Sequence, residues 1–340
     1  MTTGTTIILG IESSCDDTAV AVIRGNVILS NVVASQLIHS RYGGVIPEIA
    51  SRNHQEMIWL TMQEALNQAN VGMEQLNAIA VTKGPGLLGS LLVGVSFAKG
   101  LSLVTNKPLL GVHHMKAHIL AHFIADANQI APPFPFLCLT VSGGHTQIVL
   151  VKTPLEMEIL GKTIDDAAGE AFDKAAKMLG LPYPGGPFID KYGMLGNENK
   201  FVFSKPKIND LDFSFSGLKT SIKYQLEKWE REDSNFVKSN RNDLCASIQK
   251  TIVDILVDKC ILAVKQTGIR DFALAGGVSA NSKLRAQFVG KMDEINVKTY
   301  IPKFDYCTDN GAMIAMAGKF LFEHKIFENQ ELCAQAKLNF

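Results

Sequence analysis

The stretch IILGIESSCDDTAVAVIRGNVILSNVVA, residues 7–34, decides the fold. Its first apolar run stops at a turn of small and polar residues, 13–18, and a second apolar run of similar length follows at once. Two such runs joined by a polar turn are typical of a β-hairpin. Residues 135–161, PFLCLTVSGGHTQIVLVKTPLEMEILG, repeat the pattern around a turn at 142–146. The sequence therefore predicts a weak internal duplication in which each half begins with a hairpin.

Helical and strand patterns alternate after each hairpin, which is typical of α/β layering. After the first hairpin we expect helices at 47–70, from Gly86 and from His114, and strands at 78–82 and 109–112. After the second we expect helices at 166–179, 216–229 and 242–267, a helix capped by Ser279, a helix from Asp309, and strands at 272–275 and 297–301.

The segment IAPPFP, residues 130–135, interrupts the pattern and predicts a boundary between two lobes, 1–130 and 131–340. The length of 340 residues agrees, because it is about twice that of a typical domain. Two α/β lobes that each begin with a hairpin form the architecture of actin, hexokinases and Hsp70-type ATPases. We therefore expect that α/β fold class, with a nucleotide cleft between the lobes.

Charge and cysteine content narrow the class of protein. The 33 basic residues balance the 33 acidic ones, so no overall field attracts nucleic acid, and RNA contact must come from a local patch or a partner. The six cysteines are scattered without a C-x-x-C pair, which indicates a reducing compartment. The apolar run at 87–104 approaches membrane-span length, but glycines and Lys99 interrupt it. We expect a buried or interface helix there, in a cytoplasmic protein without a membrane span.

Two glycine turns are candidates for ligand binding. In the turn SGGHT, residues 142–146, glycines let consecutive backbone amides approach an oxyanion, although Gly-Gly is also common in ordinary turns. The segment ALAGGVSAN ends a predicted strand with two glycines and continues into a helix, with Asn281 placed to bond a sugar or base. This segment can equally be an ordinary connection between a strand and a helix. The presence of both turns strengthens each interpretation.

A histidine pair indicates a metal site. In HHMKAH, His114 and His118 are four residues apart, so a helix places both imidazoles on one face. Position 115 is methionine, so the general base of an H-E-x-x-H zinc protease is lacking. A carboxylate ligand must come from elsewhere, and Asp309 is the best candidate, with helix capping as its alternative role. We expect His122 to be a surface residue rather than a third imidazole ligand.

Acidic residues suggest further roles in the site. Asp16 and Asp17 lie in the first hairpin turn, where related kinases carry an aspartate, but here Glu12 ends the preceding apolar run. This departure disfavours phosphoryl transfer to a sugar, and Asp16 can also be a simple turn residue. Glu170 and Asp173 are three residues apart on one predicted helix face and can line a polar pocket or favour the helix dipole.

Nine segments carry a resemblance to one protein family. They are GIESSCDDTAVAV, GGVIPEIASRNH, GPGLLGSLLVG, HHMKAH, VSGGHTQI, DDAAGEAFDKAAKMLGLPYPGGP, FSFSGLKT, AGGVSAN and CTDNGAMIA. Over residues 11–317 the chain resembles the bacterial branch of the tRNA N6-adenosine threonylcarbamoyltransferase family, formerly known as the O-sialoglycoprotein endopeptidase family.

The resemblance implies an acyltransferase. The enzyme would move threonylcarbamoyl from threonylcarbamoyl-adenylate to N6 of the adenosine beside the anticodon, in tRNAs reading codons that begin with A, and release AMP. It implies one metal ion per subunit, Fe(II) or Zn(II), on His114, His118 and Asp309, and a catalytic role for Asp16. The residues implied in adenylate binding are Thr140, Val141, Ser142, Gly143, Gly144, Asp173, Gly186 and Asn281, with Asp190 from the wider family.

The resemblance also implies partners, namely tRNA, a catalytically inert paralogue and a P-loop ATPase. We expect the helices at 47–70 and 86–104 to form the paralogue interface, because much apolar surface would otherwise be exposed; packing within the first lobe is the alternative. A modest basic patch suits tRNA phosphates, or is a solvated face. Its members are Lys200, Lys205, Lys207, Lys219 and Lys223.

Other functions compete with this interpretation. If the protein is an ATP-dependent kinase or ATPase, it should turn over ATP without tRNA. The histidine pair would then have no function. A metalloprotease lacks its glutamate. A scaffold like the inert paralogue should lack the histidine pair, which is present here.

Overall fold

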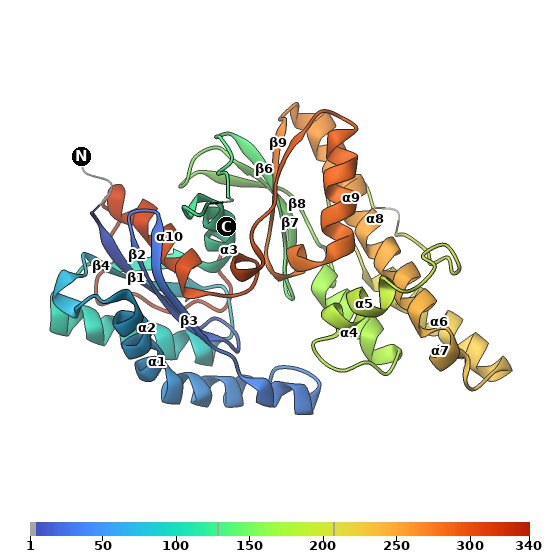
Figure 1. Ribbon diagram of the computed structural model, residues 1–340, viewed down its shortest axis with the longest axis horizontal. Coiled ribbons are helices and arrows are strands. Elements are labelled where there is room, and N and C mark those ends of the chain that lie inside the picture. Colours follow the sequence, from blue (N-terminus) through green and yellow to red (C-terminus); the bar gives the residue numbers. More distant parts are fainter. Residues whose placement is uncertain (1–4, 128, 207) are drawn as a thin grey trace. The chain divides into compact units, whose positions relative to one another are not determined.

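The computed structural model describes residues 5–127, 129–206 and 208–340, which form two compact units (Figure 1). Unit 1 contains the chain up to Pro132 together with Lys152–Met157 and Pro302–Phe340. Unit 2 contains Pro133–Val151 and Glu158–Ile301. This division differs from the expected lobes 1–130 and 131–340, because the last 39 residues, Pro302–Phe340, pack with the first unit.

The sheet of unit 1 has the strand order β3-β2-β1-β4-β5. Its strands are β1 (Ile7–Glu12), β2 (Thr18–Arg24), β3 (Val27–Ala34), β4 (Ala78–Gly84) and β5 (Leu109–His113). The first three strands are antiparallel neighbours, and β4 and β5 continue the sheet in parallel with β1.

The second five-stranded sheet has the order β10-β9-β6-β7-β8, which reproduces the first sheet when counted from β8. Its strands are β6 (Phe136–Val141), β7 (Thr146–Val151), β8 (Met157–Lys162), β9 (Asp271–Ala275) and β10 (Lys298–Tyr300). Strands β6 and β7 again form an antiparallel hairpin. Strands β9 and β10 continue the sheet in parallel with β6, on the side away from β7. The predicted duplication is therefore confirmed.

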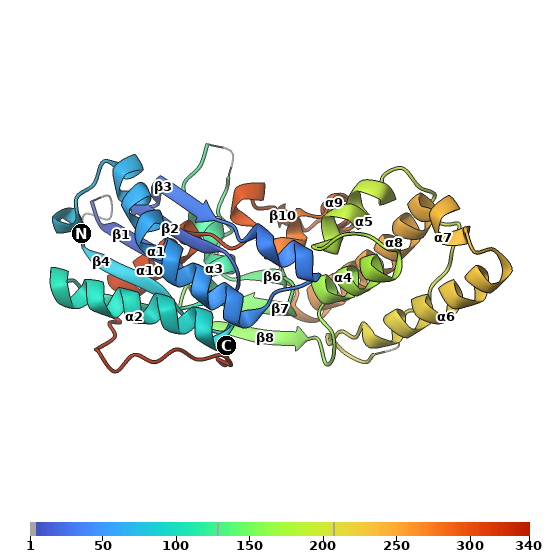
Figure 2. The same cartoon turned by 90° about the horizontal axis from the view of Figure 1, so that it is seen from below.

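Alternation along β1 divides the core of unit 1 into two layers (Figure 2). Ile7, Leu9 and Ile11 pack with α1 (Pro47–Ala69) and α2 (Leu88–Thr105). The intervening residues face α3 (His114–Leu120) and α10 (Gly311–Glu323). Because side chains alternate across a strand, Glu12 lies on the same face as α3 and α10.

Close backbone approach explains why the C-terminal segment belongs to unit 1. A Cβ on Gly10 would lie 2.4 Å from the amide nitrogen of Ala315, so only glycine lets α10 pack on β1. A Cβ on Gly311 would lie 2.4 Å from the amide nitrogen of Ala21, so the start of α10 rests on β2. The residues before α10 are thereby held against the first hairpin.

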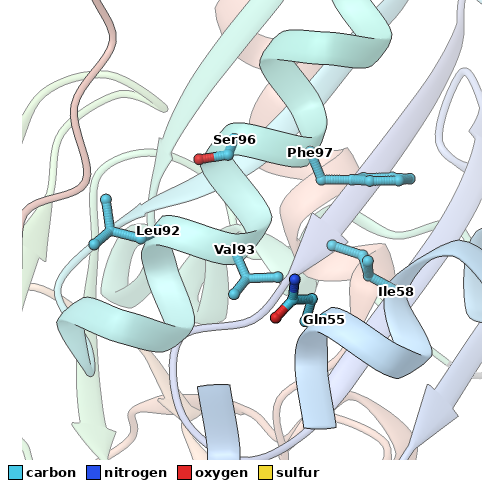
Figure 3. Close-up of a pocket in the computed structure, with 6 residues that line it drawn as sticks. All are labelled: Gln55, Ile58, Leu92, Val93, Ser96 and Phe97. Carbon is cyan, nitrogen blue, oxygen red and sulfur yellow. The ribbon is translucent and has the colours of Figure 1, made fainter. Parts of the chain in front are cut away.

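Helix α2 is the only described helix that is long and apolar enough to cross a membrane, and 39% of it is buried. It packs against β4 and α1 as part of the core of unit 1, as expected for a buried or interface helix. A groove of about 460 Å³ runs between α1 and α2 (Figure 3). Its lining residues are Gln55, Ile58, Leu92, Val93, Ser96 and Phe97.

The helices of unit 2 are α4 (Ala168–Met178), α5 (Gly185–Gly193), α6 (Ser216–Glu232), α7 (Phe236–Ser239), α8 (Arg241–Thr267) and α9 (Ser282–Asp293). Short 3-10 helices are η1 (Leu37–Tyr42), η2 (Met73–Gln75), η3 (Ala121–Phe123), η4 (Gly277–Ala280) and η5 (Phe304–Tyr306). The prediction that Ser279 caps a helix is wrong. Ser279 lies inside η4, and Asn281 caps α9 by accepting a 2.9 Å hydrogen bond from the amide of Leu284.

All six cysteines are free thiols. Cys138, Cys245, Cys260 and Cys307 are buried core residues, while Cys15 is half-buried and Cys333 is exposed.

Candidate functional site

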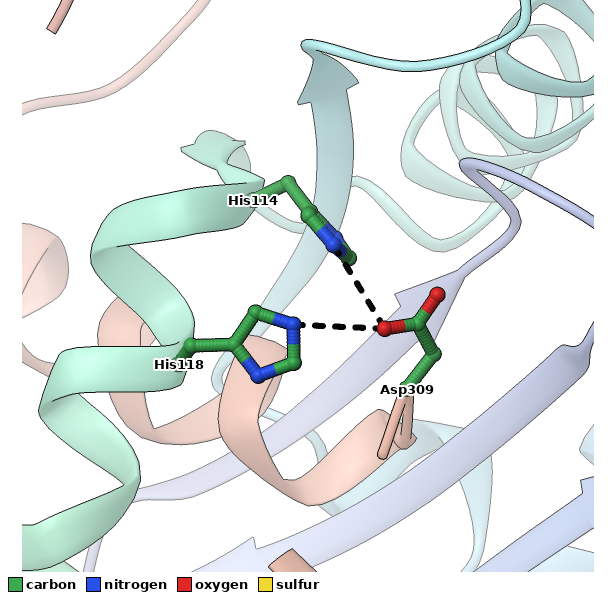
Figure 4. A group of neighbouring side chains, drawn as sticks. All are labelled: His114, His118 and Asp309. Atoms are coloured by element: carbon green, nitrogen blue, oxygen red, sulfur yellow. Dashed lines mark ion pairs between the residues drawn. The ribbon is translucent and has the colours of Figure 1, made fainter. Parts of the chain in front are cut away.

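His114, His118 and Asp309 lie together in unit 1 (Figure 4). One potential ligand atom from each residue lies within 4.8 Å of the other two. Nε2 of His118 is 3.2 Å from Oδ1 of Asp309, and Nε2 of His114 is 3.5 Å from the same oxygen. Two imidazoles and one carboxylate that converge in this way can hold a metal ion.

Each ligand is positioned by the element that carries it. Strand β5 ends at His113, and α3 begins at the next residue, so His114 and His118 are the first and fifth residues of one helix. Their rings are 4.7 Å apart between centroids. Asp309 stands two residues before Gly311, where the close contact of α10 with β2 fixes the backbone.

The alternative role of Asp309 as a helix cap is excluded. Asn310 caps α10, since its side chain accepts a 2.9 Å hydrogen bond from the amide of Met313. Among the described residues, buried Nε2 of His118 makes no hydrogen bond although it faces the Asp309 carboxylate. A cation between these atoms would satisfy both, so the three residues fit a metal ion.

Glu12 orients the first histidine ligand. Its carboxylate is fully buried at the end of β1 and accepts a 2.9 Å hydrogen bond from Nδ1 of His114. It also accepts hydrogen bonds from the hydroxyl of Thr82 at 2.7 Å and from the amide of Ser14 at 2.5 Å. A hydrogen held on Nδ1 directs a metal to Nε2 of His114, and the metal displaces the proton of that nitrogen when it binds.

The carboxylates around His114 control its protonation. Burial by itself would lower the pKa of His114, but Glu12 and Asp309 outweigh burial and raise that pKa to about 9. Burial would likewise raise the pKa of Glu12, yet the charge and hydrogen bond of His114 lower it overall. Glu12 is therefore ionised at neutral pH and is able to accept all three of its hydrogen bonds.

The turn between β1 and β2 lies next to this group. The hydroxyl of Ser14 is 3.2 Å from Nδ1 of His114. Burial raises the pKa of Asp17 to about 6, although a hydrogen bond from Ser35 lowers it, and Asp16 and Asp309 add to the increase. Asp16, the predicted catalytic residue, belongs to the same turn, and its catalytic role stays a prediction.

His122 is not the surface residue that we expected. It is 1% exposed, on η3, and it is outside the group of potential metal ligands. His122 follows His118 by four residues but is not on the same helix, because α3 ends at Leu120 and the chain continues as a 3-10 turn. The imidazole therefore leaves the face that carries His114 and His118.

The turn after β6 is open on the side of its two glycines. A Cβ added to Gly143 or Gly144 would meet no heavy atom within 4 Å. The N-terminal turn of α4 abuts the other side, because a Cβ on Gly169 would lie 2.6 Å from the carbonyl oxygen of Ser142. An accessible glycine turn beside a helix N-terminus favours an anionic group.

The two predicted glycine turns are neighbours in unit 2. Gly276 has a φ of 86°, and a Cβ there would lie 2.5 Å from the carbonyl oxygen of Val141. The loop that carries Asn281 thus begins directly at the end of β6, next to Ser142. Asn281 is almost buried, and its side-chain oxygen is engaged as the cap of α9.

Asp173 holds the start of α5 in place. Its carboxylate accepts hydrogen bonds from the amides of Gly185 at 2.7 Å and Gly186 at 3.3 Å. Burial raises the pKa of Asp173, and these two bonds offset part of the increase. Glu170, a candidate either for a polar pocket or for a favourable interaction with the helix dipole, forms an ion pair with Lys174 at 2.6 Å.

Asp190 links α5 to α8 and α9. It accepts hydrogen bonds from the hydroxyl and the amide of Ser282 at 2.6 and 3.0 Å, and from the side chain of Gln249 at 2.5 Å. These contacts fix the start of the helix that Asn281 caps. The role of Asp190 in adenylate binding stays a prediction, in addition to this structural role.

Three of the four described lysines of the expected basic patch lie close to an acidic side chain. Lys200 pairs with Asp243 at 2.7 Å, and Lys205 pairs with Asp254 at 3.0 Å. Lys223 lies 3.7 Å from Glu227 on the same helix, and Lys207 falls outside the described residues. Ion-paired lysines attract phosphates weakly, so the patch gives little support for tRNA binding.

Comparison with known proteins adds independent findings. A family model described as tRNA N6-adenosine threonylcarbamoyltransferase matches residues 27–316. The protein of that name from Riemerella anatipestifer is 55% identical over 331 residues, which cover 97% of each chain. The one from Phocaeicola vulgatus is 56% identical over 319 residues, covering 93% of this chain and 94% of the relative.

Two solved structures show a similar fold. Full-length HypF in its phosphate- and nucleotide-bound form has a TM-score of 0.62 at 14% identity, covering 95% of this chain and 47% of HypF. The activator of 2-hydroxyisocaproyl-CoA dehydratase from Clostridium difficile, with bound ADPNP, has a TM-score of 0.51 at 13% identity, covering 95% and 99%. These similarities confirm the predicted actin/hexokinase-like α/β class and show the fold alone.

Proposed function

Because this chain belongs to the tRNA N6-adenosine threonylcarbamoyltransferase family, we propose that it transfers threonylcarbamoyl from threonylcarbamoyl-adenylate to N6 of the adenosine beside the anticodon. The tRNAs are those that read codons beginning with A. The observation that carries this proposal is the match over 97% of each chain with a relative of that name.

His114, His118 and Asp309 would hold one metal ion in this enzyme. Two imidazoles and a carboxylate suit Fe(II), our first choice, and also Zn(II). When bound, the ion would supply Lewis-acid polarisation of the carbamoyl oxygen, an effect of several kcal/mol. Glu12, 2.9 Å from Nδ1 of His114, would hold a hydrogen on that nitrogen and so leave Nε2 to the metal.

The chain's own groups account for the remaining steps. The amides of residues 142–144 would bind the phosphate of the adenylate, and Asp173, Gly186, Asp190 and Asn281 would shape its pocket, together with Thr140 and Val141. N6 of adenine attacks the carbamoyl carbon, a C–N bond forms, and the C–O bond to phosphate breaks to release AMP. Asp16 takes the proton that N6 loses.

Partners follow from the same assignment. An inert paralogue would dock on the exposed apolar side chains of α1 and α2, and a P-loop ATPase would act with it in the cytoplasm. Trp59 and Leu60 of α1 are 46% and 57% exposed, and Leu92 of α2 is 48% exposed beside the groove. Such a surface is typical of protein–protein contacts.

Direct transfer tests the proposal. Purified protein, supplied with its partner proteins and carbamoyl-labelled threonylcarbamoyl-adenylate, is expected to label a tRNA with adenosine beside the anticodon. The matched substrate has guanosine at that single position and should stay unlabelled. Equal labelling of both tRNAs, or rapid ATP turnover without tRNA, would refute the proposal and favour a kinase or ATPase.

We expect Gly143→Ala to weaken adenylate binding without disturbing the fold. The new methyl group meets no protein atom within 4 Å, so it occupies only the space in front of the turn. Loss of one or two hydrogen bonds to a charged phosphate should raise KM about 10-fold to 100-fold. Gly290→Ala on α9, whose Cβ also meets nothing, is the control. The same KM in both variants would contradict a phosphate site here.

A further inference from the structure

His54 joins helix α1 to the turn that precedes β2. Its Nε2 lies 2.9 Å from the carbonyl oxygen of Cys15, and its Nδ1 lies 2.7 Å from the hydroxyl of Thr18. The imidazole is fully buried, and both of its nitrogens are used. The side chain of His54 therefore contacts both ends of the segment that contains Asp16 and Asp17.

The two contacts define a single arrangement of hydrogens. A carbonyl oxygen only accepts, so Nε2 of His54 carries the hydrogen and donates it to Cys15. Burial lowers the pKa of His54, partly offset by its bond to Cys15, so the ring is neutral and Nδ1 accepts the hydrogen of Thr18. Neither contact can slip without loss of a buried hydrogen bond.

The turn of residues 13–18 lies next to the group formed by His114, His118 and Asp309. Ser14, next to Cys15, donates its amide hydrogen to Glu12 and places its hydroxyl 3.2 Å from Nδ1 of His114. A shift of this turn would move Asp16 and would also disturb the group that orients His114.

We propose that His54 is a positioning residue for the transfer reaction, which fixes the turn of residues 13–18 so that Asp16 and the hydrogen bonds to His114 keep their places. His54 itself does not touch substrate or metal. The inference rests on the proposed function for its kinetic consequence, whereas its structural consequence is independent of activity.

Two variants each remove the hydrogen bond between His54 and Thr18. In His54→Gln, the side-chain nitrogen can still donate to the Cys15 carbonyl, but no acceptor stands at the place of Nδ1 to receive the hydrogen of Thr18. In Thr18→Val, a side chain of the same shape lacks the hydroxyl. The control is Thr61→Val, because Thr61 is 3% exposed on the same helix and donates only to the carbonyl of Met57 in that helix.

We expect both variants to keep a melting temperature close to that of the control. Their kcat should fall about 10-fold to 100-fold, since small displacements of reacting groups cost about that much. KM for threonylcarbamoyl-adenylate should change little, because the proposed adenylate residues belong to unit 2. Amide hydrogen exchange in the peptide covering residues 13–18 should be faster than in the control.

Two results would overturn the proposal. One is a kcat and an exchange rate for both variants equal to those of Thr61→Val. The other is a fall in kcat that only follows a fall in melting temperature, which would make His54 an ordinary core residue. If wild-type protein transfers nothing to tRNA, the proposed function fails, but the exchange measurement still decides whether His54 fixes the turn.

Discussion

The double variant His114→Ala, His118→Ala is expected to lose its bound metal and its transfer activity together. The two imidazoles are two of the three side chains that converge on the same point, and Asp309 alone is a weak ligand. Loss of Lewis-acid stabilisation of several kcal/mol corresponds to a rate reduction of about 1,000-fold or more. Elemental analysis and labelled transfer on the same preparation measure both quantities.

The control for this experiment is His122→Ala. His122 is also a buried histidine, one helical segment later, but it is not part of the metal group. It should keep the metal and most of the activity, so any general effect of removing a buried imidazole is measured separately. Full transfer by a metal-free double variant would rule out a role for the metal in the reaction.

Local patterns in the sequence predicted the elements that depend on neighbouring residues. The two hairpins were predictable because apolar runs and polar turns are adjacent in the chain, and the histidine pair because a helix brings residues 114 and 118 onto one face. Strand and helix positions also followed from periodicity, within a few residues at their ends.

Contacts between distant segments were not predictable in the same way. Glu12 and His114 are 102 residues apart, and nothing near Glu12 indicates that its carboxylate will meet an imidazole. The return of 302–340 to unit 1 depends on two missing Cβ atoms, at Gly10 and Gly311, which resemble any other glycines in the sequence.

The caps of two helices could not be identified from the sequence. Ser279 and Asp309 both looked like caps, but the following asparagines, Asn281 and Asn310, are the caps. Either residue type can cap a helix, so only the backbone geometry decides which one does. For Asp309, this one-residue difference leaves the carboxylate available to a metal.

Glu12→Gln is expected to weaken metal binding about 10-fold to 100-fold while the protein stays folded, because residues that orient metal ligands typically contribute this much. The substitution changes neither size nor shape. It replaces one of two acceptor oxygens by an amide group that only donates. All three partners of Glu12, namely the amide of Ser14, the hydroxyl of Thr82 and Nδ1 of His114, donate to it in the native protein.

Glutamine therefore cannot satisfy this site in either orientation. If its oxygen accepts from His114, its amide group faces the N–H of Ser14. If its oxygen accepts from Ser14, its amide group faces Nδ1 of His114, and the ring must move its hydrogen to Nε2, the atom that faces Asp309. A metal cannot bind a protonated nitrogen, so the second orientation competes directly with the ion.

Thr82→Val is the matched control for Glu12→Gln, because it removes a hydrogen bond to Glu12 and leaves the contact with His114 intact. Competition titration of Zn(II) or Co(II) against a chelating indicator measures the affinity without reference to activity. An affinity of Glu12→Gln equal to that of Thr82→Val would show that Glu12 does not set the hydrogen position on His114.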